Sequence, residues 1–529
     1  MSMIFFLAAA AMAGCTLVPC KHALHMFQQN RYELTRYTAW SRESLKGAWN
    51  RNTRTALALA VLFAAALILK GRFSSYQILI LAAAAALAVS QILRERRKTY
   101  IKPLVMTDRV RRQIGVLAVL LAAVIVLFLN GESAISWWAA LCLTLVGPWI
   151  LIYPMSWITE PIELAVKQHY LNDAKSILKK HTGLVIIGIT GSYGKTSTKN
   201  VMQSILSEQF NTLMTPASYN TPMGITRTVR EYLKPIHQVF VCEMGADKVG
   251  DITELVNFVH PSIGVVTSIG PQHLGTFGSQ ENITREKMQM IEMLPKDGLG
   301  ILNYDNELIR SWKVQNPVRC VTYGIDHSDV DYHAESLSYG ANGSSFVLVH
   351  GDERIPFQTR LLGKLNILNI LSAIAAARYL NVSWPVIQRA VKEMKQVEHR
   401  LEQKRINGFS FIDDAFNANP SGARMALEVL SGMPGRRWIV TPGMIDLGER
   451  QAEINSAFGG EIKGRADEVI LVGSTQTKPI HEGLAAAGFD MEQVHVMDTV
   501  REAFAYLYQH ASREDTILLE NDLPDAFNK

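Results

Sequence analysis

The chain has 529 residues, a formal net charge of +5 and five cysteines. Its length allows about two to four domains. The scattered cysteines form no C-x-x-C pair, which argues against a disulfide framework or a zinc site. The excess positive charge is concentrated in two short basic segments near the N-terminus, so it does not indicate nucleic-acid binding. The cysteines are Cys15, Cys20, Cys142, Cys242 and Cys320.

Residues 1–155 are unusually apolar, and we predict that they form a transmembrane region of about five helices. Crossing a bilayer takes roughly 17 to 20 apolar residues, a length that Tyr76–Leu93 and Ile135–Tyr153 reach. The shorter internal runs are apolar on every face, which favours lipid over a buried soluble helix. A cleaved signal sequence is the alternative for the first run, but no positive charge precedes it. The five runs are Met3–Pro19, Thr55–Leu69, Tyr76–Leu93, Ile114–Leu129 and Ile135–Tyr153.

Charge between these runs predicts their orientation. Lys21–Arg54 holds seven Lys or Arg against two Glu, and Arg94–Gln113 holds eight against two acids, whereas Asn130–Ala134 carries only Glu132. Basic loops stay in the cytoplasm. The sequence therefore predicts a multi-pass protein of the cell (inner) membrane, in contact with membrane lipid, whose domains after Tyr153 are cytoplasmic and have access to ATP.

Two α/β domains are predicted beyond the membrane. Apolar positions over 156–182 have helical spacing and predict a connecting helix. From 183 to 396, strand-like runs alternate with helical segments, which predicts a mostly parallel sheet. Five more such strands over 397–529 predict a second, Rossmann-like open sheet. The predicted strands are Val239–Cys242, Ile263–Thr267, Gly300–Asn303, Phe409–Asp413, Trp438–Thr441, Val469–Val472, Val494–Val496 and Thr516–Leu519.

A glycine-rich segment, Gly188–Lys199 (GITGSYGKTSTK), is the strongest functional signal. It follows the apolar run Gly183–Ile187 and leads into the amphipathic stretch Asn200–Leu206, so it occupies a strand-to-helix turn. It is the variant T-G-x-x-G-K-T of the phosphate-binding loop, because Ile189 replaces the first glycine of the general form. The alternative is a chance Gly-rich turn.

This loop predicts an ATP site with bound Mg²⁺. Gly191 and Gly194 let the backbone approach phosphate oxygens, and the helix N-terminus adds partial positive charge. Lys195 reaches the β- and γ-phosphates, and the Thr196 hydroxyl can bind Mg²⁺. The predicted nucleotide-binding residues of the loop are Gly191, Ser192, Gly194, Lys195, Thr196 and Ser197.

Three further residues suggest a catalytic site beside the loop. Glu243 ends an apolar strand, where a carboxylate can bind Mg²⁺. His273 follows the next strand, at the edge where open α/β sheets bind ligands. Lys287 follows on a helix. Each alone has an ordinary alternative, namely a solvated strand end, a turn residue and an exposed helix charge, but together they favour catalysis.

With these motifs the chain, from Gly183 onward, resembles the Mur ligases, ATP-dependent enzymes that join amino acids or peptides to peptidoglycan precursors. The Asp413–Ser421 segment (DDAFNANPS) is the most specific part of the resemblance. The other matching segments are Thr190–Ser197, Tyr219–Gly224, Glu243–Gly245, His273–Gly278, Gly363–Asn369 and His399–Leu401.

The resemblance implies an acid–amino-acid ligase. ATP would phosphorylate a carboxylate of a cell-wall precursor to an acyl phosphate, which an amino acid or D-alanyl-D-alanine would attack. Two Mg²⁺ ions are implied, with Lys287 carbamylated by CO₂. By this resemblance the catalytic residues are Lys195, His273, Lys287 and Arg400; the metal ligands are Thr196, Glu243, His273 and Lys287; further ATP contacts are Asn366, Asn369, Arg400 and Asp414; and substrate contacts are Asn220, Asn417 and Asn419.

Several departures from the family pattern keep other functions open. Leu365 and Asn455 stand where histidines are expected, and Asn521–Asp525 replaces a Lys-Gly-Ser-Arg-like segment. Membrane spans take the place of the usual domain that binds the UDP-sugar. The alternatives are a poly-γ-glutamate-type polymer ligase and an ATP-binding membrane scaffold with weakened catalysis. The acyl substrate, the amine donor and the oligomeric state are not determined by the sequence.

Overall fold

The structure is a computed structural model that describes residues 3–44, 73–96, 103–130, 134–340, 343–396, 399–415, 420–445, 447 and 450–521. The chain divides into two compact units, Met1–His169 and Tyr170–Lys529. The predicted apolar run Thr55–Leu69 and the predicted substrate contacts Asn417 and Asn419 lie outside the described residues.

The first unit is helical in the part of the chain that the structure describes. Helices coincide with four of the predicted apolar runs. Three described helical segments, Phe6–Gln29, Asp108–Leu129 and Ile135–Lys180, are long and apolar enough to cross a membrane. The helices are α1 (Met3–Gln29), α2 (Leu34–Ser44), α4 (Phe73–Glu95), α5 (Asp108–Leu129) and α6 (Ala134–Lys180).

Helix α6 is longer than the sequence suggested. We expected an apolar span ending at Tyr153 and a separate connecting helix, yet α6 continues without a break through Pro148, Pro154 and Pro161. A proline removes one backbone hydrogen bond, and long helices accommodate this loss as a bend. Beyond residue 170, Leu171 and Ala174 of the same helix are buried in the core of the second unit.

The second unit contains a nine-stranded sheet of order β2-β3-β1-β4-β5-β6-β7-β8-β9. Strands β2 to β6 and the β6–β7 pair are parallel, and β7, β8 and β9 are antiparallel. The mixed α/β class is confirmed. The strands are β1 (Val185–Thr190), β2 (Thr212–Met214), β3 (Val239–Glu243), β4 (Ile263–Val266), β5 (Leu299–Asn303), β6 (Arg319–Gly324), β7 (Tyr332–Gly340), β8 (Gly343–His350) and β9 (Glu353–Thr359).

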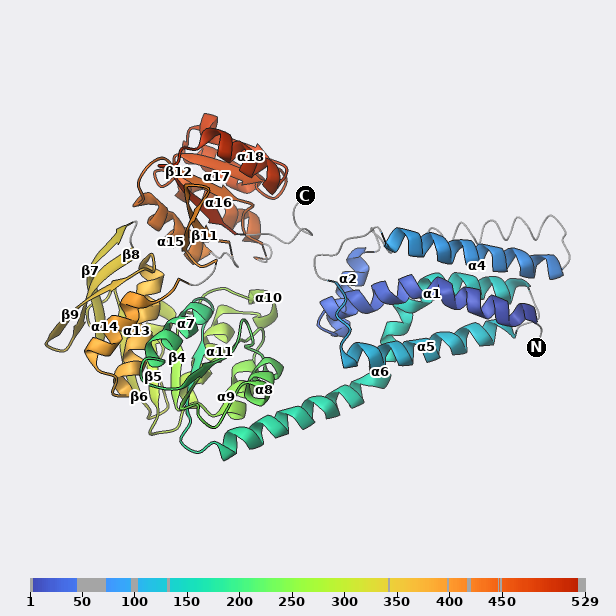
Figure 1. The fold of residues 1–529 in the computed structure, drawn as a ribbon, viewed down its shortest axis with the longest axis horizontal. Helices are drawn as coiled ribbons and strands as arrows, with labels where there is room; N and C mark the ends of the chain where they lie inside the picture. The colour runs from blue at the N-terminus through green and yellow to red at the C-terminus, as the bar shows by residue number, and fades with distance from the viewer. Residues whose placement is uncertain are drawn as a thin grey trace. The chain divides into compact units, whose positions relative to one another are not determined.

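Helices cover both faces of this sheet (Figure 1). Parallel strands buried on both faces are continuously apolar, which is why β1, β3, β4 and β5 could be recognised in the sequence. One face carries α7 (Lys195–Leu206), α13 (Lys364–Tyr379) and α14 (Trp384–Glu393); the other carries α8 (Pro222–Glu231), α9 (Asp251–Val259), α11 (Gln280–Glu292) and the end of α6. The short helices α10 (Leu274–Phe277) and α12 (Glu307–Arg310) lie in the loops.

A separate six-stranded sheet follows, of order β10-β11-β15-β12-β13-β14. Only the edge strand β10 is antiparallel to its neighbour among these described strands. All five strands predicted for this region are present. The strands are β10 (Glu402–Ile406), β11 (Phe409–Asp414), β12 (Arg437–Thr441), β13 (Glu468–Val472), β14 (Val494–Met497) and β15 (Thr516–Glu520).

The connections between the strands of this sheet place β15 at a position where the direction of strand order changes. Helices α15 (Pro420–Ser431), α16 (Gln451–Ile462) and α17 (Lys478–Ala486) pack on one face, and α18 (Val500–His510), which leads to β15, packs on the other. Because β15 lies between β11 and β12 but is reached from the opposite face, its carboxyl end is at a topological switch point, where open α/β sheets bind ligands.

Candidate active site

The phosphate loop between β1 and α7 depends on two glycines. Gly194 caps α7 with φ +84°, and Gly191 has φ +152°, both in the region that side chains disfavour. A Cβ at Gly191 would also collide with the Thr267 hydroxyl. The backbone is therefore open at the N-terminus of α7, in the shape that receives a phosphate.

Hydrogen bonds attach this loop to the segment that follows β4. The Ser192 hydroxyl donates to the Gly270 carbonyl oxygen and accepts from the Gly270 N–H, both at 3.0 Å. The Ser192 N–H donates to the Ser268 carbonyl oxygen at 2.7 Å, and the Tyr193 N–H donates to the Ser268 hydroxyl at 3.2 Å. Ser192, expected to contact ATP, thus uses its hydroxyl to anchor the loop.

Lys195 lies over the loop. Its Nζ donates to the carbonyl oxygens of Gly191 at 2.6 Å and of Ser192 at 3.2 Å. Burial lowers the pKa of Lys195. The negative charge of Glu243 acts to raise this pKa, and the positive charge of Arg400 acts to lower it. The ammonium is therefore held where a loop-bound phosphate would meet it.

Glu243 is the centre of the site. One carboxylate oxygen, Oε1, accepts from the Thr196 hydroxyl at 3.3 Å and from Asn220 Nδ2 at 3.0 Å. The other, Oε2, forms an ion pair with Lys199 Nζ at 2.9 Å. The structure thus brings together three residues predicted from the sequence and adds Lys199, which was not predicted. Its signal was the i, i+4 spacing from Lys195, which places both ammonium groups on one side of α7.

Lys287 and His273 meet at the loop that follows β3. Lys287 is 2% exposed, and its Nζ donates to the Ala246 carbonyl oxygen at 3.3 Å. Burial, followed by the positive charge of Lys195, lowers the pKa of Lys287 to about 7. His273 Nε2 lies 3.3 Å from Asp247 Oδ1. Because Ala246 and Asp247 are consecutive, one short segment connects the two predicted metal ligands.

This segment is held by two carboxylates. Asp251 Oδ2 accepts from the N–H groups of Asp247 at 2.9 Å and Lys248 at 3.0 Å. Glu286, next to Lys287, accepts from the N–H groups of Gly250 at 2.8 Å and Ile252 at 2.6 Å. These bonds satisfy backbone donors at the start of α9, where negative charge is favoured. They fix the loop that carries Asp247.

Asn366 and Asn369 lie on α13, which packs against α7. Asn369 Oδ1 accepts from the Thr198 hydroxyl at 2.9 Å and lies 3.3 Å from the position of a Cβ at Gly194. Asn366 Nδ2 donates to the Leu362 carbonyl oxygen at 2.8 Å. Asn369 therefore borders the phosphate loop, and Asn366 lies behind it, with its Oδ1 3.5 Å from Asn369 Nδ2. Ser197, on the same helix as Thr198, is buried.

Arg400 approaches the site from a turn before the second sheet. The flanking residues His399 and Leu401 both have positive φ, at 57° and 49°, and the Leu401 N–H donates to Asp414 Oδ1 at 3.1 Å. Burial lowers the pKa of Arg400, while the carboxylates of Asp414 and Glu243 act to raise it. The guanidinium is thus within electrostatic reach of carboxylates from both sheets.

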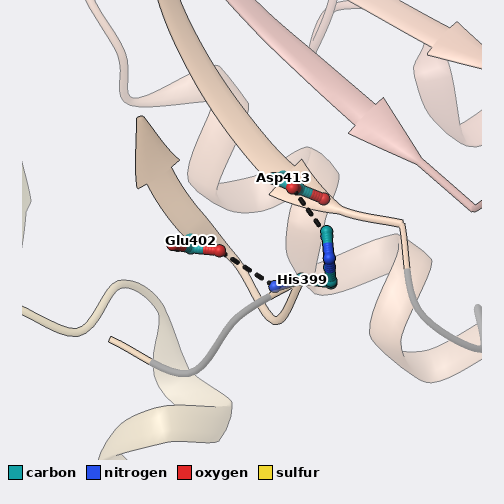
Figure 2. A group of neighbouring side chains, drawn as sticks. All are labelled: His399, Glu402 and Asp413. Carbon is teal, nitrogen blue, oxygen red and sulfur yellow. Dashed lines mark hydrogen bonds and ion pairs between the residues drawn. The ribbon is translucent and has the colours of Figure 1, made fainter. Parts of the chain in front are cut away.

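A polar network supports this turn (Figure 2). His399 Nδ1 lies 2.8 Å from Asp413 Oδ2, and the His399 N–H donates to Glu402 Oε2 at 3.0 Å. The three side chains have the spacing of a metal site. Lys404 Nζ, however, lies 2.8 Å from both Glu402 Oε2 and Asp413 Oδ2. Its ammonium supplies the positive charge, so this cluster is an ion-pair network that holds the Arg400 turn.

Asn455 has a structural role where the family pattern led us to expect a histidine. It is 2% exposed. Its Oδ1 accepts from the Met444 N–H at 2.9 Å, and its Nδ2 donates to the carbonyl oxygens of Met444 and Gln451, both at 2.9 Å. The amide therefore closes the turn after β12.

The residues fit a nucleotide with a divalent cation. An open glycine loop, a hydroxyl from Thr196 and a carboxylate from Glu243 are the groups that Mg²⁺ with a phosphate chain requires. Thr196 and Glu243 are in direct contact, and Lys195 faces the same loop. Thr196 and Lys195 lie at the start of α7, directly after β1, and Glu243 lies at the end of β3, which pairs with β1. The fold therefore brings these groups together.

Comparison with known proteins gives two family matches. Residues 189–377 match the Mur ligase middle domain, and residues 399–520 match the Mur ligase glutamate ligase domain. The UDP-N-acetylmuramoyl-tripeptide--D-alanyl-D-alanine ligase of Bacillus subtilis (strain 168) is 30% identical over 353 residues, 66% of this chain and 75% of that protein. The same enzyme of Escherichia coli (strain K12) is 27% identical over 326 residues, 60% and 72% of the two chains.

Solved structures have the same fold. MurF from Acinetobacter baumannii superposes with a TM-score of 0.61 at 24% identity, covering 67% of this chain and 77% of that one. MurF ligase from Thermotoga maritima in complex with ADP also gives 0.61, at 22% identity, covering 67% and 80%.

Proposed function

Because this chain belongs to the Mur ligase family of ATP-dependent ligases, we propose that it joins a peptidoglycan precursor to an amino acid or to D-alanyl-D-alanine. The observation that carries this proposal is the Glu243 cluster, in which Thr196 and Asn220 contact one carboxylate oxygen next to the phosphate loop. The substrate pair follows the relatives' names, UDP-N-acetylmuramoyl-tripeptide and D-alanyl-D-alanine.

The proposed reaction has two steps. A carboxylate oxygen of the precursor attacks the γ-phosphorus of ATP, which releases ADP and gives an acyl phosphate. The amine nitrogen then attacks the acyl carbon, and the tetrahedral intermediate collapses to an amide and inorganic phosphate. Lys195, held over the loop by Gly191 and Ser192, would stabilise the negative charge of the transferring phosphoryl group.

We propose two metal positions. Thr196 and Glu243 would hold one Mg²⁺, and His273 and Lys287 would hold the second; the ions would neutralise phosphate charge. Lys287 needs a negative charge for this role. A pKa of about 7 leaves much of its amine neutral at physiological pH, so the amine can add CO₂ to form a carbamate with release of a proton.

The remaining assignments concern the nucleotide and the substrates. Asn369, which borders the loop, and Asn366, which lies next to it on α13, would contact the nucleotide. Arg400 and Asp414 would contact it from the last domain. Asn220 donates to Glu243 and is proposed to face the acyl substrate. The roles of Asn417 and Asn419 stay predictions from the resemblance.

We also propose that the first unit is embedded in the cell membrane and that the ligase works at the inner leaflet. Three described helices have the required length and apolarity, and the two basic segments between apolar runs favour cytoplasmic catalytic domains. The family matches begin at residue 189, so the helical unit lies outside them. A membrane-linked precursor is therefore as natural a substrate as a UDP-linked one.

Phosphate release by the full-length protein in detergent tests this proposal. UDP-linked and lipid-linked precursors are each combined with single amino acids and with D-alanyl-D-alanine. We expect release that requires ATP, a precursor and an amine. Phosphate release that depends on a glutamate polymer would support the polymer ligase instead. If none of the substrate combinations gives phosphate release, the proposal is contradicted.

A further inference from the structure

Glu520, the last residue of β15, is a buried acid without a visible partner. It is 0% exposed, and neither carboxylate oxygen has a hydrogen-bond partner in the described part of the chain. Burying an ionised carboxylate without a partner is strongly unfavourable. Such groups are rare in native proteins and call for an explanation, of which an absent ligand is one.

Asp414 lies beside Glu520. The two residues are paired in the parallel register of β11 and β15, so their side chains leave the sheet on the same face. That face is the one covered by α15, α16 and α17, because Ile412 and Leu518, two residues earlier in each strand, belong to that core. The two carboxyl groups therefore share one environment.

Burial shifts the pKa of both carboxyl groups in the same direction. Burial raises the pKa of Asp414 to about 6, against the lowering effect of Arg400. Burial, together with the charge of Asp414, raises the pKa of Glu520 well above its usual range. One cation, Arg400, is thus within reach of Asp414, while the pair can carry two negative charges. A ligand that brings one positive charge and N–H donors would balance them.

The position of the pair in the fold points to a ligand site. Both residues end their strands at the carboxyl edge, and β15 is the strand at the topological switch point of this sheet. Arg400 connects this edge to the Glu243 cluster, since it is within electrostatic reach of both Asp414 and Glu243.

We propose that Glu520 binds the ammonium group of the amine donor, with the negative charge of the neighbouring Asp414 adding to the attraction. This inference rests on the proposed ligase function and specifies the donor: its cationic end faces this pair, and a donor carboxylate would be repelled from it. Transfer of one proton from the ammonium to the Glu520 carboxylate leaves a neutral carboxylic acid and a neutral amine, and the amine is the form that attacks an acyl phosphate.

The test uses the full-length protein in detergent and the variant Glu520→Gln, which keeps the shape and removes the negative charge. The donors are D-alanyl-D-alanine and D-alanyl-D-alaninamide, which has the ammonium group but no carboxylate. We expect the wild type to use the amide at least as well as the free dipeptide. Glu520→Gln should raise the KM for both donors by roughly tenfold to a hundredfold, the usual effect of losing a hydrogen bond to a charged group, with the KM for ATP unchanged.

Hydroxylamine separates this inference from the proposed function. It is uncharged at neutral pH and traps an acyl phosphate as a hydroxamate without needing an ammonium site. We expect equal hydroxamate formation by the wild type and Glu520→Gln. No hydroxamate from the wild type would contradict the acyl-phosphate mechanism itself, whereas hydroxamate with unchanged donor KM in Glu520→Gln would overturn only the ammonium site.

Glu468→Gln is the matched control. Glu468 is also buried, at 3% exposure, but it begins β13 at the opposite edge of the sheet and has partners: it forms an ion pair with Arg436 and lies 2.8 Å from His495 Nε2. The KM of Glu468→Gln for both donors should equal that of the wild type. Thermal unfolding of Glu520→Gln should occur at or above the wild-type temperature. A lower unfolding temperature together with a higher KM for every substrate would show that Glu520 has a structural role. A higher Mg²⁺ requirement with an unchanged KM for the donors would show that it binds metal. Either result would refute the proposal.

Discussion

The Lys199 ammonium lies 2.9 Å from Glu243 Oε2, and both side chains are almost completely buried. Lys199 Nζ also donates to the Ala217 carbonyl oxygen at 2.5 Å, in the segment that leads to Asn220. One cation from α7 therefore holds the carboxylate of β3 and the loop that carries a proposed substrate contact.

This ion pair predicts a strong effect of Lys199→Met. The variant leaves the negative charge of Glu243 buried without its cation, a change that typically lowers the free energy of unfolding by about 3–5 kcal/mol. Thermal unfolding in detergent, without nucleotide, measures it. The double variant Lys199→Met/Glu243→Gln removes both charges and should be more stable than Lys199→Met alone; equal stability would mean that the two groups do not interact.

Lys195→Ala should abolish ATP-dependent ligation. No other cation takes the place of its Nζ on the carbonyl oxygens of Gly191 and Ser192 in the described site, and losing such a contact costs about 3 kcal/mol or more of transition-state stabilisation. This corresponds to a loss of kcat of about a hundredfold or more, which leaves turnover near the background. Lys392→Ala, an exposed residue of α14, is the control. Near-normal turnover by Lys195→Ala would contradict the assignment of this loop as the phosphate-binding loop.

Activity should depend on CO₂ through Lys287. The amine must be neutral to add CO₂, and its pKa is lowered to about 7, so the carbamate should form above pH 7 and be lost as the pH falls through 7. Lys287→Ala should lose ligation but keep ATP binding, because Lys195, Thr196 and Glu243 remain. Carbon-13 NMR with labelled bicarbonate detects the carbamate directly. Full activity of Lys287→Ala in CO₂-free buffer would show that the second metal position is wrong.

The network in Figure 2 predicts an indirect effect on nucleotide binding. Lys404→Met removes the ammonium that lies between Glu402 and Asp413, so these carboxylates repel each other and the Arg400 turn loosens. We expect the KM for ATP to rise about fivefold, the effect of ~1 kcal/mol for a partly exposed network. Lys404→Arg should restore most of the affinity; no change in either variant would mean that the turn is held by the backbone alone.

The membrane proposal predicts the sides of two reporter fusions. A reporter inserted at 130–134 should be external, and one fused after Tyr153 should be cytoplasmic, because the basic segments stay inside. Alkaline phosphatase is active only outside the cytoplasm, and a fluorescent protein of the usual kind fluoresces only inside it. The two reporters therefore give opposite signals at each position. The reverse pattern would separate the ligase from cytoplasmic ATP and contradict the model of its action.

The parts of the fold that follow local rules could be predicted. Strands β1, β3, β4 and β5 are short apolar runs between turn residues, and so are the five parallel strands of the second sheet. Strands β6 to β9 were not predicted. In Tyr332–Gly340, for example, only Tyr332 and Ala334 are buried, and most of the other residues are polar. Its strand character comes from antiparallel pairing with Gly343–His350, which no local pattern reveals.

The candidate site divides in the same way. The phosphate loop and Glu243 belong to compact sequence motifs. Lys199 and Glu520 do not: the role of Lys199 depends on contact with a carboxylate of another strand, and Glu520 becomes unusual only because β15 places it beside Asp414. Burial and strand register, which the sequence does not display, decide whether a charged residue is an ordinary surface group or part of a site.

The reciprocal hydrogen bonds between Ser192 and Gly270 have a consequence for inhibition. They join the phosphate loop to the segment that ends at His273, so neither can be displaced alone. A compound that wedges under the loop near Gly191 would shift the histidine as well, although it touches no part of it.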